Sequence, residues 1–374
     1  MINRRTMLGG MAATALSGAP SARAEEATYL LPEWHPHAAC VMTWCDNEAV
    51  YGANSVAQIR VEQARIAKAV SRFEPVTMLA NSHEIGRAKR MCGPKVTVRE
   101  IAVDDIWARD TLPIIQARGR KDAADRPVVE ALGWNFNAWG EKYPGLHLAD
   151  RTLAARYAQE EALPFLRAPI VAEGGAMETD GIGTLITTET CLLNENRNPG
   201  MSRAEVEEAL KDYALCDHVI WLWGSEADFV TDGHVDGICR IIRPGLAVAE
   251  VTDDKEDPEY AELQENAVRL EAARDARGEK LEVIRLNRPR WEEMPERGPD
   301  FSASYVNSYF PNGGIVMPKF GDGARDRAAR RLFEELEPKR KVVQIAIDEI
   351  AEGGGGIHCC TMQIPAPVPE ASDG

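Results

Sequence analysis

The sequence predicts an α/β fold in which a strand–helix unit recurs about five times along the chain. The composition, 44% hydrophobic and 27% charged over 374 residues, is typical of a folded globular protein. Segments with the 3.6-residue periodicity of helices alternate with short apolar runs typical of strands. Polar or glycine-rich loops follow the apolar runs at similar intervals, and this rhythm favours a radial or stacked arrangement of repeats.

Four segments have the apolar spacing of an amphipathic helix. The first covers residues 56–73, where apolar side chains recur at intervals of three, four or seven. Ser202 and Glu205 form a capping box, which predicts that a second helix begins there. Apolar stripes in residues 260–270 and 328–336 predict the other two.

Eight short runs between these segments are predicted as strands, because they are apolar and have turn-forming residues nearby. They cover residues 76–80, 96–101, 184–188, 219–223, 246–251, 281–286, 315–318 and 342–347.

Five polar loops accompany the strands, at residues 104–111, 173–183, 228–237, 302–314 and 351–361. Their markers Asp110, Glu173, His234, Asn307 and Cys359 are separated by 63, 61, 73 and 52 residues. Five similar units could each deliver one polar side chain to a common axis. The alternative is an ordinary α/β chain, in which loops recur at about this interval without any repeat.

The first 24 residues have the pattern of an export signal. Arg4 and Arg5 precede a mildly apolar stretch, and Ala22 to Ala24 offer a small-residue cleavage site. The paired arginines predict the twin-arginine route and a periplasmic or secreted protein, although an ordinary basic terminus is the alternative. Residues 25–374 are then expected to form a single catalytic domain, with a flexible tail at 365–374.

Charge and cysteine spacing exclude several functions. Acidic residues outnumber basic ones 59 to 43, for a net charge of −16, so a nucleic-acid partner is not expected. No apolar stretch reaches the ~18–20 residues of a membrane span. The eight cysteines include no C-x-x-C pair, so no metal site is predicted. Spacing leaves the pairing of Cys40 with Cys45 undecided, and a homo-oligomer is possible.

A candidate nucleophile follows a run of four glycines at residues 353–356. Such a run costs chain entropy and is easier to justify where the backbone approaches a ligand. Cys359 lies just beyond it and could be a positioned thiol, with a glycine-rich hairpin and a buried cysteine as the alternative. Chemistry alone does not choose between Cys359 and its neighbour Cys360.

Two further clusters supply an imidazole and carboxylates. In a strand, His234 and Asp236 would point the same way, an arrangement suited to acid–base work; a structural histidine is the alternative. Asp110 follows Trp107 in an acidic segment that could trap a planar cation, unless it is a solvated turn. Glu173 follows an apolar run and is weak evidence by itself. Together, a thiol, an imidazole and several carboxylates suit a guanidinium substrate.

Ordered motifs across nearly the whole chain then carry a family resemblance. They include Trp107 to Thr111, Glu173 to Gly175, Thr231 to Asp236, Ala303 to Asn307 and Gly355 to Cys359. The chain resembles the agmatine deiminases and, more broadly, the guanidine-modifying enzymes that include the bacterial-type peptidylarginine deiminases. The resemblance implies the pentein fold, a five-bladed α/β propeller with pseudo-fivefold symmetry.

The resemblance also implies roles for individual residues. Cys359 would be the nucleophile and His234 the general acid–base, while Asp110 and Asp236 would hold the guanidinium. A covalent S-alkylthiouronium intermediate would form on Cys359, and no metal or organic cofactor would be needed. The expected reaction is agmatine to N-carbamoylputrescine and ammonia, a step of polyamine metabolism toward putrescine.

Trp107, Glu173 and Asn307 are expected beside the substrate, and Cys360 receives no role. Three places depart from the family pattern: Val230 replaces an acid, Leu112 replaces a glycine, and residues 176–180 differ. Glu178 could compensate for the lost acid. A peptidyl-arginine or another guanidine is therefore an alternative substrate, and a non-catalytic guanidine-binding protein is the other alternative.

Overall fold

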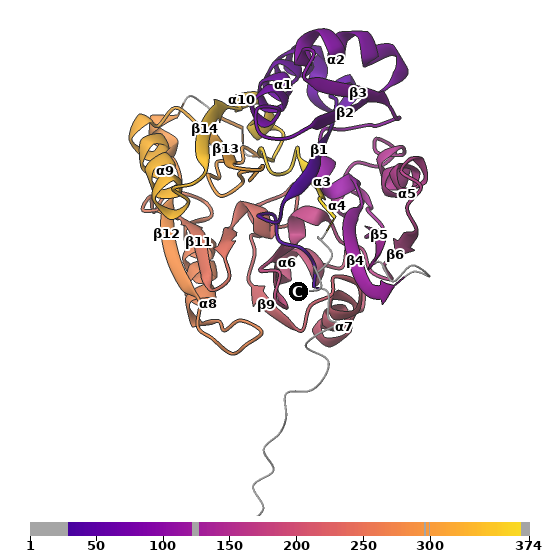
Figure 1. Ribbon diagram of the computed structural model, residues 1–374. Coiled ribbons are helices and arrows are strands. Elements are labelled where there is room, and N and C mark those ends of the chain that lie inside the picture. Colours follow the sequence, from indigo (N-terminus) through magenta and orange to yellow (C-terminus); the bar gives the residue numbers. More distant parts are fainter. Residues whose placement is uncertain (1–28, 122–126, 295–296, 299, 368–374) are drawn as a thin grey trace, which may run out of the picture.

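The computed structural model describes residues 29–121, 127–294, 297–298 and 300–367, and these residues form five separate sheets. The sheets lie around a common centre, with helices toward the outside (Figure 1). The predicted signal at 1–24 falls outside the described residues, so export stays a prediction. Among the described residues, no helix combines the length and apolarity that a membrane crossing requires.

Three of the sheets share one topology. An antiparallel strand pair is followed by a helix, which returns the chain to a third strand parallel to the second. Their elements are β4 (Ile114–Lys121), β5 (Pro127–Gly133), α5 (Asp150–Glu160) and β6 (Phe165–Arg167); β7 (Glu178–Thr179), β8 (Thr184–Thr188), α7 (Arg203–Tyr213) and β9 (His218–Leu222); β10 (Cys239–Arg243), β11 (Leu246–Val251), α8 (Tyr260–Ala272) and β12 (Glu282–Asn287).

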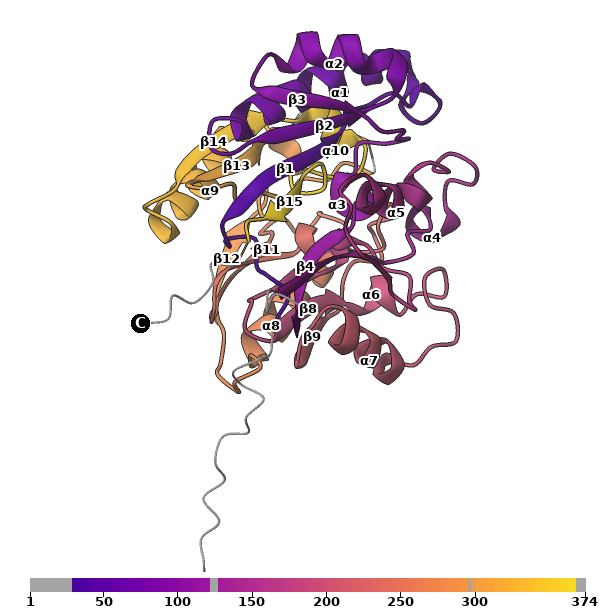
Figure 2. The same ribbon diagram turned by 45° about the vertical axis from the view of Figure 1, so that its right-hand side comes forward.

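The remaining two sheets vary the same unit. In one, a single antiparallel bridge from Tyr309 to Val316 stands in place of the first strand. In the other, the C-terminal strand pairs antiparallel with the first strand of the chain and closes the ring (Figure 2). Their elements are β13 (Gly314–Lys319), α9 (Gly323–Leu336) and β14 (Lys341–Ala346); β15 (Met362–Pro365), β1 (His37–Thr43), α1 (Glu48–Val70), β2 (Val76–Ala80), α2 (Ile85–Cys92) and β3 (Val96–Glu100).

Each predicted marker residue lies on a linker that enters a new sheet. Asp110 precedes β4, Glu173 precedes β7, His234 precedes β10, and Asn307 precedes the bridge at Tyr309. Cys359 precedes β15 in the same way. The sequence spacing of the markers is therefore the spacing of the repeat.

The short helices of the linkers are η1 (Ser82–Glu84), α3 (Ala108–Thr111), α4 (Ala138–Glu141), η2 (Gly174–Ala176), α6 (Glu189–Leu192), η3 (Val235–Gly237), η4 (Trp291–Glu293) and α10 (Asp348–Glu352).

Apolar packing between the outer helices and the sheets holds each unit. On α1, Val56, Ile59 and Ile66 are fully buried, and each such side chain contributes about 1.5–3 kcal/mol. Part of the tail predicted at 365–374 is held in place, because Pro365 belongs to β15 and the backbone N–H of Ala366 donates to the carbonyl of Pro36. Residues 368–374 lie outside the described residues. All eight cysteines are free, Cys40 and Cys45 included.

Candidate active site

Three predicted side chains from two linkers converge on Gly175, which lies on a third. A Cβ atom built there would lie 2.6 Å from His234 Nδ1, 2.9 Å from Asp110 Oδ1 and 3.0 Å from Asp236 Oδ2. No side chain fits among these groups, so the position requires glycine. The structure thus brings together the imidazole and both carboxylates that the sequence singled out.

The thiol of Cys359 belongs to the same cluster. Its Sγ accepts a hydrogen bond of 3.1 Å from Asn307 Nδ2 and donates to Asp236 Oδ2 at 3.5 Å. Burial raises the pKa of the Cys359 thiol well above its usual value, and the carboxylates of Asp236 and Asp110 raise it further. The thiol is therefore protonated when these carboxylates carry no cation between them.

Two neutral donors hold Asp110 in place. The backbone N–H of Gly175 donates to Oδ1 and the indole N–H of Trp139 donates to Oδ2, both at 2.9 Å. Burial raises the pKa of the Asp110 carboxyl, although the His234 imidazole opposes the rise and the Trp139 hydrogen bond does so more weakly. Asp110 and Asp236 thus face one space with their acceptor oxygens.

His234 lies between two carboxylates without a hydrogen bond to either. Its Nδ1 is 3.8 Å from Asp110 Oδ1 and its Nε2 is 3.5 Å from Glu173 Oε2, and neither ring nitrogen has a hydrogen-bond partner. Burial lowers the pKa of this imidazole, but Asp110, Cys191 and Glu173 outweigh it and raise the pKa well above its usual value.

The segment around His234 is a loop, as predicted for residues 228–237, and not the strand in which His234 and Asp236 would alternate onto one face. His234 precedes the short helix η3, in which Asp236 lies. The carboxylate of Asp228 accepts hydrogen bonds from the backbone N–H groups of Val230, Thr231 and Gly233, and this folds the segment into a loop. His234 and Asp236 share a side because of this turn, not because of strand alternation.

Glu173 acts as an ionic support for the imidazole. Arg197 Nε donates to its Oε1 at 2.7 Å, and both side chains are fully buried. Burial would raise the pKa of Glu173, but Arg197 and His234 lower it to about 2. Glu173 is therefore ionised and presents its other oxygen, Oε2, to His234.

The side chains of Trp107 and Asn307 explain why glycines precede Cys359. A Cβ at Gly355 would lie 2.3 Å from the Trp107 ring, and one at Gly356 would lie 2.4 Å from Asn307 Oδ1. Gly354 adopts a φ of +84°, in the left-handed region that favours glycine. The backbone carrying Cys359 can therefore lie directly against both side chains.

Sequence reasoning missed a second layer of charged residues behind the site. His358 Nδ1 is 2.7 Å from Asp236 Oδ2, and its Nε2 is 2.8 Å from Glu33 Oε2. Arg109 donates to Glu33 at 2.9 Å, and Arg240 is also paired with it. Although burial opposes them, Arg240, His358 and Arg109 hold the pKa of Glu33 well below its usual value. The position of His358 beside Cys359 was the available signal.

Glu178 belongs to this layer and does not compensate for the missing acid at position 230. It accepts a hydrogen bond from the backbone N–H of Ile241 and lies 3.6 Å from Arg240. The buried guanidinium holds it away from the cavities described next. The expectation that Glu178 compensates for the lost acid is therefore wrong.

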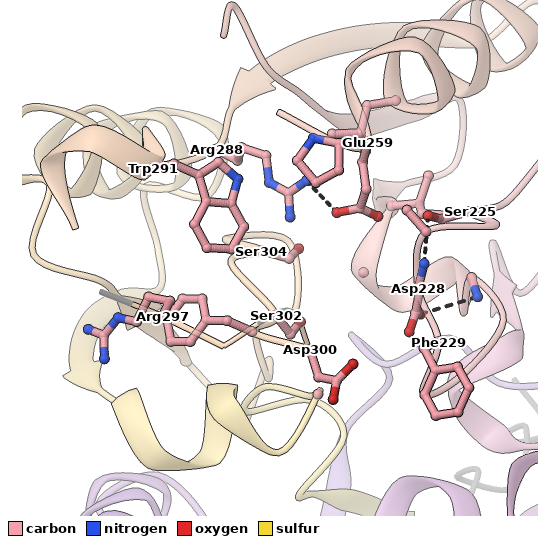
Figure 3. A pocket seen from close by; sticks show the side chains of 18 of the residues that line it. Ser225, Asp228, Phe229, Glu259, Arg288, Trp291, Arg297, Asp300, Ser302 and Ser304 are labelled. Atoms are coloured by element: carbon pink, nitrogen blue, oxygen red, sulfur yellow. Dashed lines mark hydrogen bonds and ion pairs between the residues drawn. The ribbon is translucent and has the colours of Figure 1, made fainter. Parts of the chain in front are cut away.

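A cavity of about 520 Å³ opens beside His234 (Figure 3). Its lining includes the carboxylates of Asp228, Glu259 and Asp300, and Figure 3 shows Asp300 directed into it. The lining cations are paired: Arg288 lies 2.5 Å from Glu259, and Arg297 binds Asp348 on α10. The cavity therefore favours cations.

A second cavity, of about 210 Å³, has Gly353 in its lining, whereas Gly354 lines the first. It is lined by Trp107, Trp139 and Val230, and Asp300 lines both cavities. Val230 is buried and packs against Gly354, so the residue that departs from the family pattern lines the second cavity and contacts a glycine of the first.

Two clusters of described residues bring three possible metal ligands together. Glu173, Cys191 and His234 form a fully buried one, whereas Asp46, His83 and Glu84 form a partly exposed one. The buried cluster includes two of the predicted site residues and one cysteine that the sequence analysis did not single out.

Comparison with known proteins places the chain in a family. The model of the Porphyromonas-type peptidyl-arginine deiminases matches residues 29–365. The chain belongs to this family. It is 38% identical to the agmatine deiminase of Pseudomonas aeruginosa (strain UCBPP-PA14) over 356 residues, covering 90% of this chain and 95% of that one. It is 37% identical to the agmatine deiminase of Medicago truncatula over 358 residues, covering 89% and 95%.

The fold agrees with the sequence match. A solved agmatine deiminase of Enterococcus faecalis superposes with a TM-score of 0.83 at 29% identity, covering 92% of this chain and 97% of that one. The expected pentein fold is thereby confirmed, and the five sheets correspond to its five units. The protein is a hydrolase of carbon–nitrogen bonds in linear amidines.

Proposed function

We propose that the protein hydrolyses agmatine to N-carbamoylputrescine and ammonia, with Cys359 as the nucleophile. The observation that carries the proposal is the convergence of Asp110, Asp236 and His234 on Gly175, with the Cys359 thiol bonded to Asp236. Relatives at 37–38% identity across the chain bear the name agmatine deiminase, which supports the choice of substrate.

Asp110 and Asp236 bind the guanidinium. Its planar fork of N–H groups matches carboxylate oxygens, and two ionised carboxylates keep it charged and electrophilic. Burial excludes water from the pair and strengthens both contacts. Fixing the guanidinium carbon beside Sγ supplies several kcal/mol of the barrier through orientation.

Binding the cation also activates the thiol. Asp236 and Asp110 raise the pKa of Cys359 in the empty site, and a bound guanidinium cancels their charge. The thiol then loses its proton to solvent, and the thiolate forms a bond to the guanidinium carbon. His234, held protonated by Asp110, Cys191 and Glu173 despite its burial, donates a proton to one amino group. The C–N bond breaks and ammonia leaves.

Hydrolysis of the S-alkylthiouronium completes the cycle. His234 is now neutral and removes a proton from water, and the water oxygen bonds to the central carbon. The C–S bond breaks, the new hydroxyl group loses its proton to solvent so that the ureido product forms, and the thiolate of Cys359 is restored. Asn307 Nδ2 donates to Sγ in the resting enzyme and can stabilise this thiolate.

The lining charges favour agmatine over free arginine. Arginine carries an α-carboxylate, and the cations Arg288 and Arg297 of the described lining are already paired with carboxylates. An ammonium end instead meets the exposed carboxylate of Asp300, which lines both cavities. A substrate with a cationic rather than a zwitterionic end therefore fits.

The test is a substrate panel of agmatine, arginine and a peptide ending in arginine, assayed for ammonia and ureido product. We expect agmatine to be preferred over the others by about a hundredfold in kcat/KM, or about 2.7 kcal/mol. Mass spectrometry of quenched enzyme should find the adduct on Cys359. Release of ammonia from none of these guanidines would overturn the proposal, and preference for the peptide would replace agmatine as substrate.

We also propose that residues 1–24 direct export by the twin-arginine route. The support is the Arg4-Arg5 pair ahead of an apolar stretch and a small-residue cleavage site. Replacing both arginines by lysine should leave the activity in the cytoplasmic fraction, whereas the unaltered chain should be periplasmic or secreted. An unchanged distribution would contradict the proposal.

A further inference from the structure

Cys191 lies against two residues of the site although the reaction assigns it no role. It belongs to α6, and its Sγ is 3.9 Å from Glu173 Oε2. The same carboxylate oxygen is 3.5 Å from His234 Nε2. The three ligand atoms all lie within 4.8 Å of one another, and all three side chains are buried.

The ligand atoms of this cluster are directed at each other, and the Cys191 thiol donates to Glu173 Oε2 at 3.9 Å. Both ring nitrogens of His234 lack a hydrogen-bond partner. Arg197 holds Glu173 through Oε1, which leaves Oε2 facing the imidazole and the thiol. A buried imidazole with an unpartnered nitrogen is the observation that points to a ligand, because such groups normally find a partner.

We propose that Glu173, Cys191 and His234 form an inhibitory site for Zn²⁺. Carboxylate, imidazole and thiolate are the ligands that zinc takes in proteins, with bonds of about 2.0–2.3 Å. In a tetrahedral site, such bonds place neighbouring ligand atoms about 3.3–3.7 Å apart. The measured separations of 3.5 Å and 3.9 Å need only small adjustments to meet this geometry.

The surrounding charges indicate that zinc binds here reversibly and is not held permanently. On binding zinc, Cys191 and His234 must present a thiolate and a neutral imidazole, and their protons pass to solvent. Glu173 and the thiolate then balance the two positive charges of the ion. Arg197, 2.7 Å from the other oxygen of Glu173, opposes the cation, although Asp232 already compensates part of its charge.

Zinc at this site would stop the reaction through His234. With zinc on Nε2, the only ring proton lies on Nδ1, the nitrogen that faces Asp110 and Asp236. Nδ1 could donate this proton to the leaving amine only by becoming a zinc-bound imidazolate, and without a lone pair it cannot remove a proton from water. The inhibition rests on the proposed function, whereas zinc binding does not, so the two can fail separately.

Zinc content tests the binding. The Cys359→Ala variant removes the competing nucleophilic thiol; it is mixed with zinc chloride, desalted and analysed for metal. We expect about one zinc per chain, none in Cys359→Ala/Cys191→Ser, and again one in the matched control Cys359→Ala/Cys216→Ser. Co²⁺ in place of zinc should give a thiolate charge-transfer band that disappears with Cys191→Ser. Zinc that persists without Cys191, or none in Cys359→Ala, overturns the proposal.

Activity tests the inhibition in the full chain. Within each variant, the rate with zinc is compared with the rate after chelation by EDTA. Cys191→Ser should need at least tenfold more zinc for half-inhibition than the unaltered protein or Cys216→Ser. Equal sensitivity would place the inhibitory zinc on another ligand and overturn the proposal. Stoichiometric zinc without inhibition would leave the binding site standing but refute the role of His234.

Discussion

The two carboxylates that face the guanidinium are held in opposite ways. Asp110 receives neutral hydrogen bonds from a backbone N–H and an indole, and burial raises its pKa. Asp236 is bound by His358, whose other nitrogen faces Glu33, and its pKa is lowered despite burial because His358 and His234 outweigh the desolvation. Two residues with one expected role thus differ: charged neighbours lower the pKa of Asp236, whereas burial raises the pKa of Asp110.

The largest effect is expected from Asp236→Asn. The amide removes one charge from the guanidinium pocket and replaces the carboxylate oxygen that contacts His358 Nδ1 and the Cys359 thiol. We expect kcat/KM to fall by about a thousandfold, or about 4 kcal/mol. Asp110→Asn is the matched variant and should lose about tenfold less, because the two groups that donate hydrogen bonds to Asp110 are neutral. Equal losses in steady-state assays would remove the distinction between the two sides.

Glu33→Gln should mainly affect stability. Glu33 balances Arg109 and Arg240, and both guanidinium groups are buried. Removing one partner of such a network costs about 3–5 kcal/mol in the free energy of unfolding. Denaturant titration measures the loss, and Glu100→Gln on the exposed end of β3 is a control expected to leave the midpoint unchanged. A loss as small as that of the control would mean that solvent reaches the network.

His358→Gln tests how Asp236 is held, because His358 positions this carboxylate. Glutamine keeps a polar side chain but cannot bridge Asp236 and Glu33 in the way that two opposed ring nitrogens do. We expect kcat/KM to fall by about 30-fold, or about 2 kcal/mol, mostly in KM because guanidinium binding suffers. His358→Asn should be no better, and a loss confined to kcat would contradict a positioning role.

Trp139→Phe should have the smallest effect. It tests the neutral hydrogen bonds that hold Asp110. It removes one hydrogen bond to Asp110, worth about 1 kcal/mol or about fivefold in kcat/KM. That hydrogen bond lowers the pKa of Asp110, so its loss raises the pKa further. Because Asp110 must be ionised to bind the cation, activity should be lost at a higher pH as the pH falls. A pH–rate profile with an unshifted acid limb would contradict this assignment.

The strands that were predicted correctly are those whose buried side chains are mostly apolar. Strands such as β2, β8 and β11 were placed within one residue, because runs like that of Leu246–Val251 are buried throughout. The inner strands β4, β7, β10 and β15 were missed, and so were β5 and β6. On β10, Arg240 is fully buried and paired with Glu33, so a charged residue occupies a core position and hides the apolar signal. β1 has a readable apolar run and could have been predicted.

The site was predictable where its residues lie on the linkers. Repeated spacing and residue chemistry singled out Asp110, His234, Asn307 and Cys359, and the structure brings these together with Asp236. Glu33 and Cys191 could not be found this way. Neither lies at a marker position of a repeat, and each acquires its chemical meaning only from a contact between segments far apart in the chain.

Ring closure by β15 has a consequence for how the protein is made. Cys359 lies three residues before this strand, and β15 completes the sheet begun by β1. During synthesis, the reactive sulfur therefore emerges after the rest of its pocket, and it reaches its partners only when the final strand docks onto the first. A nascent or prematurely released polypeptide would be inert, so catalytic competence itself reports that the whole chain has folded.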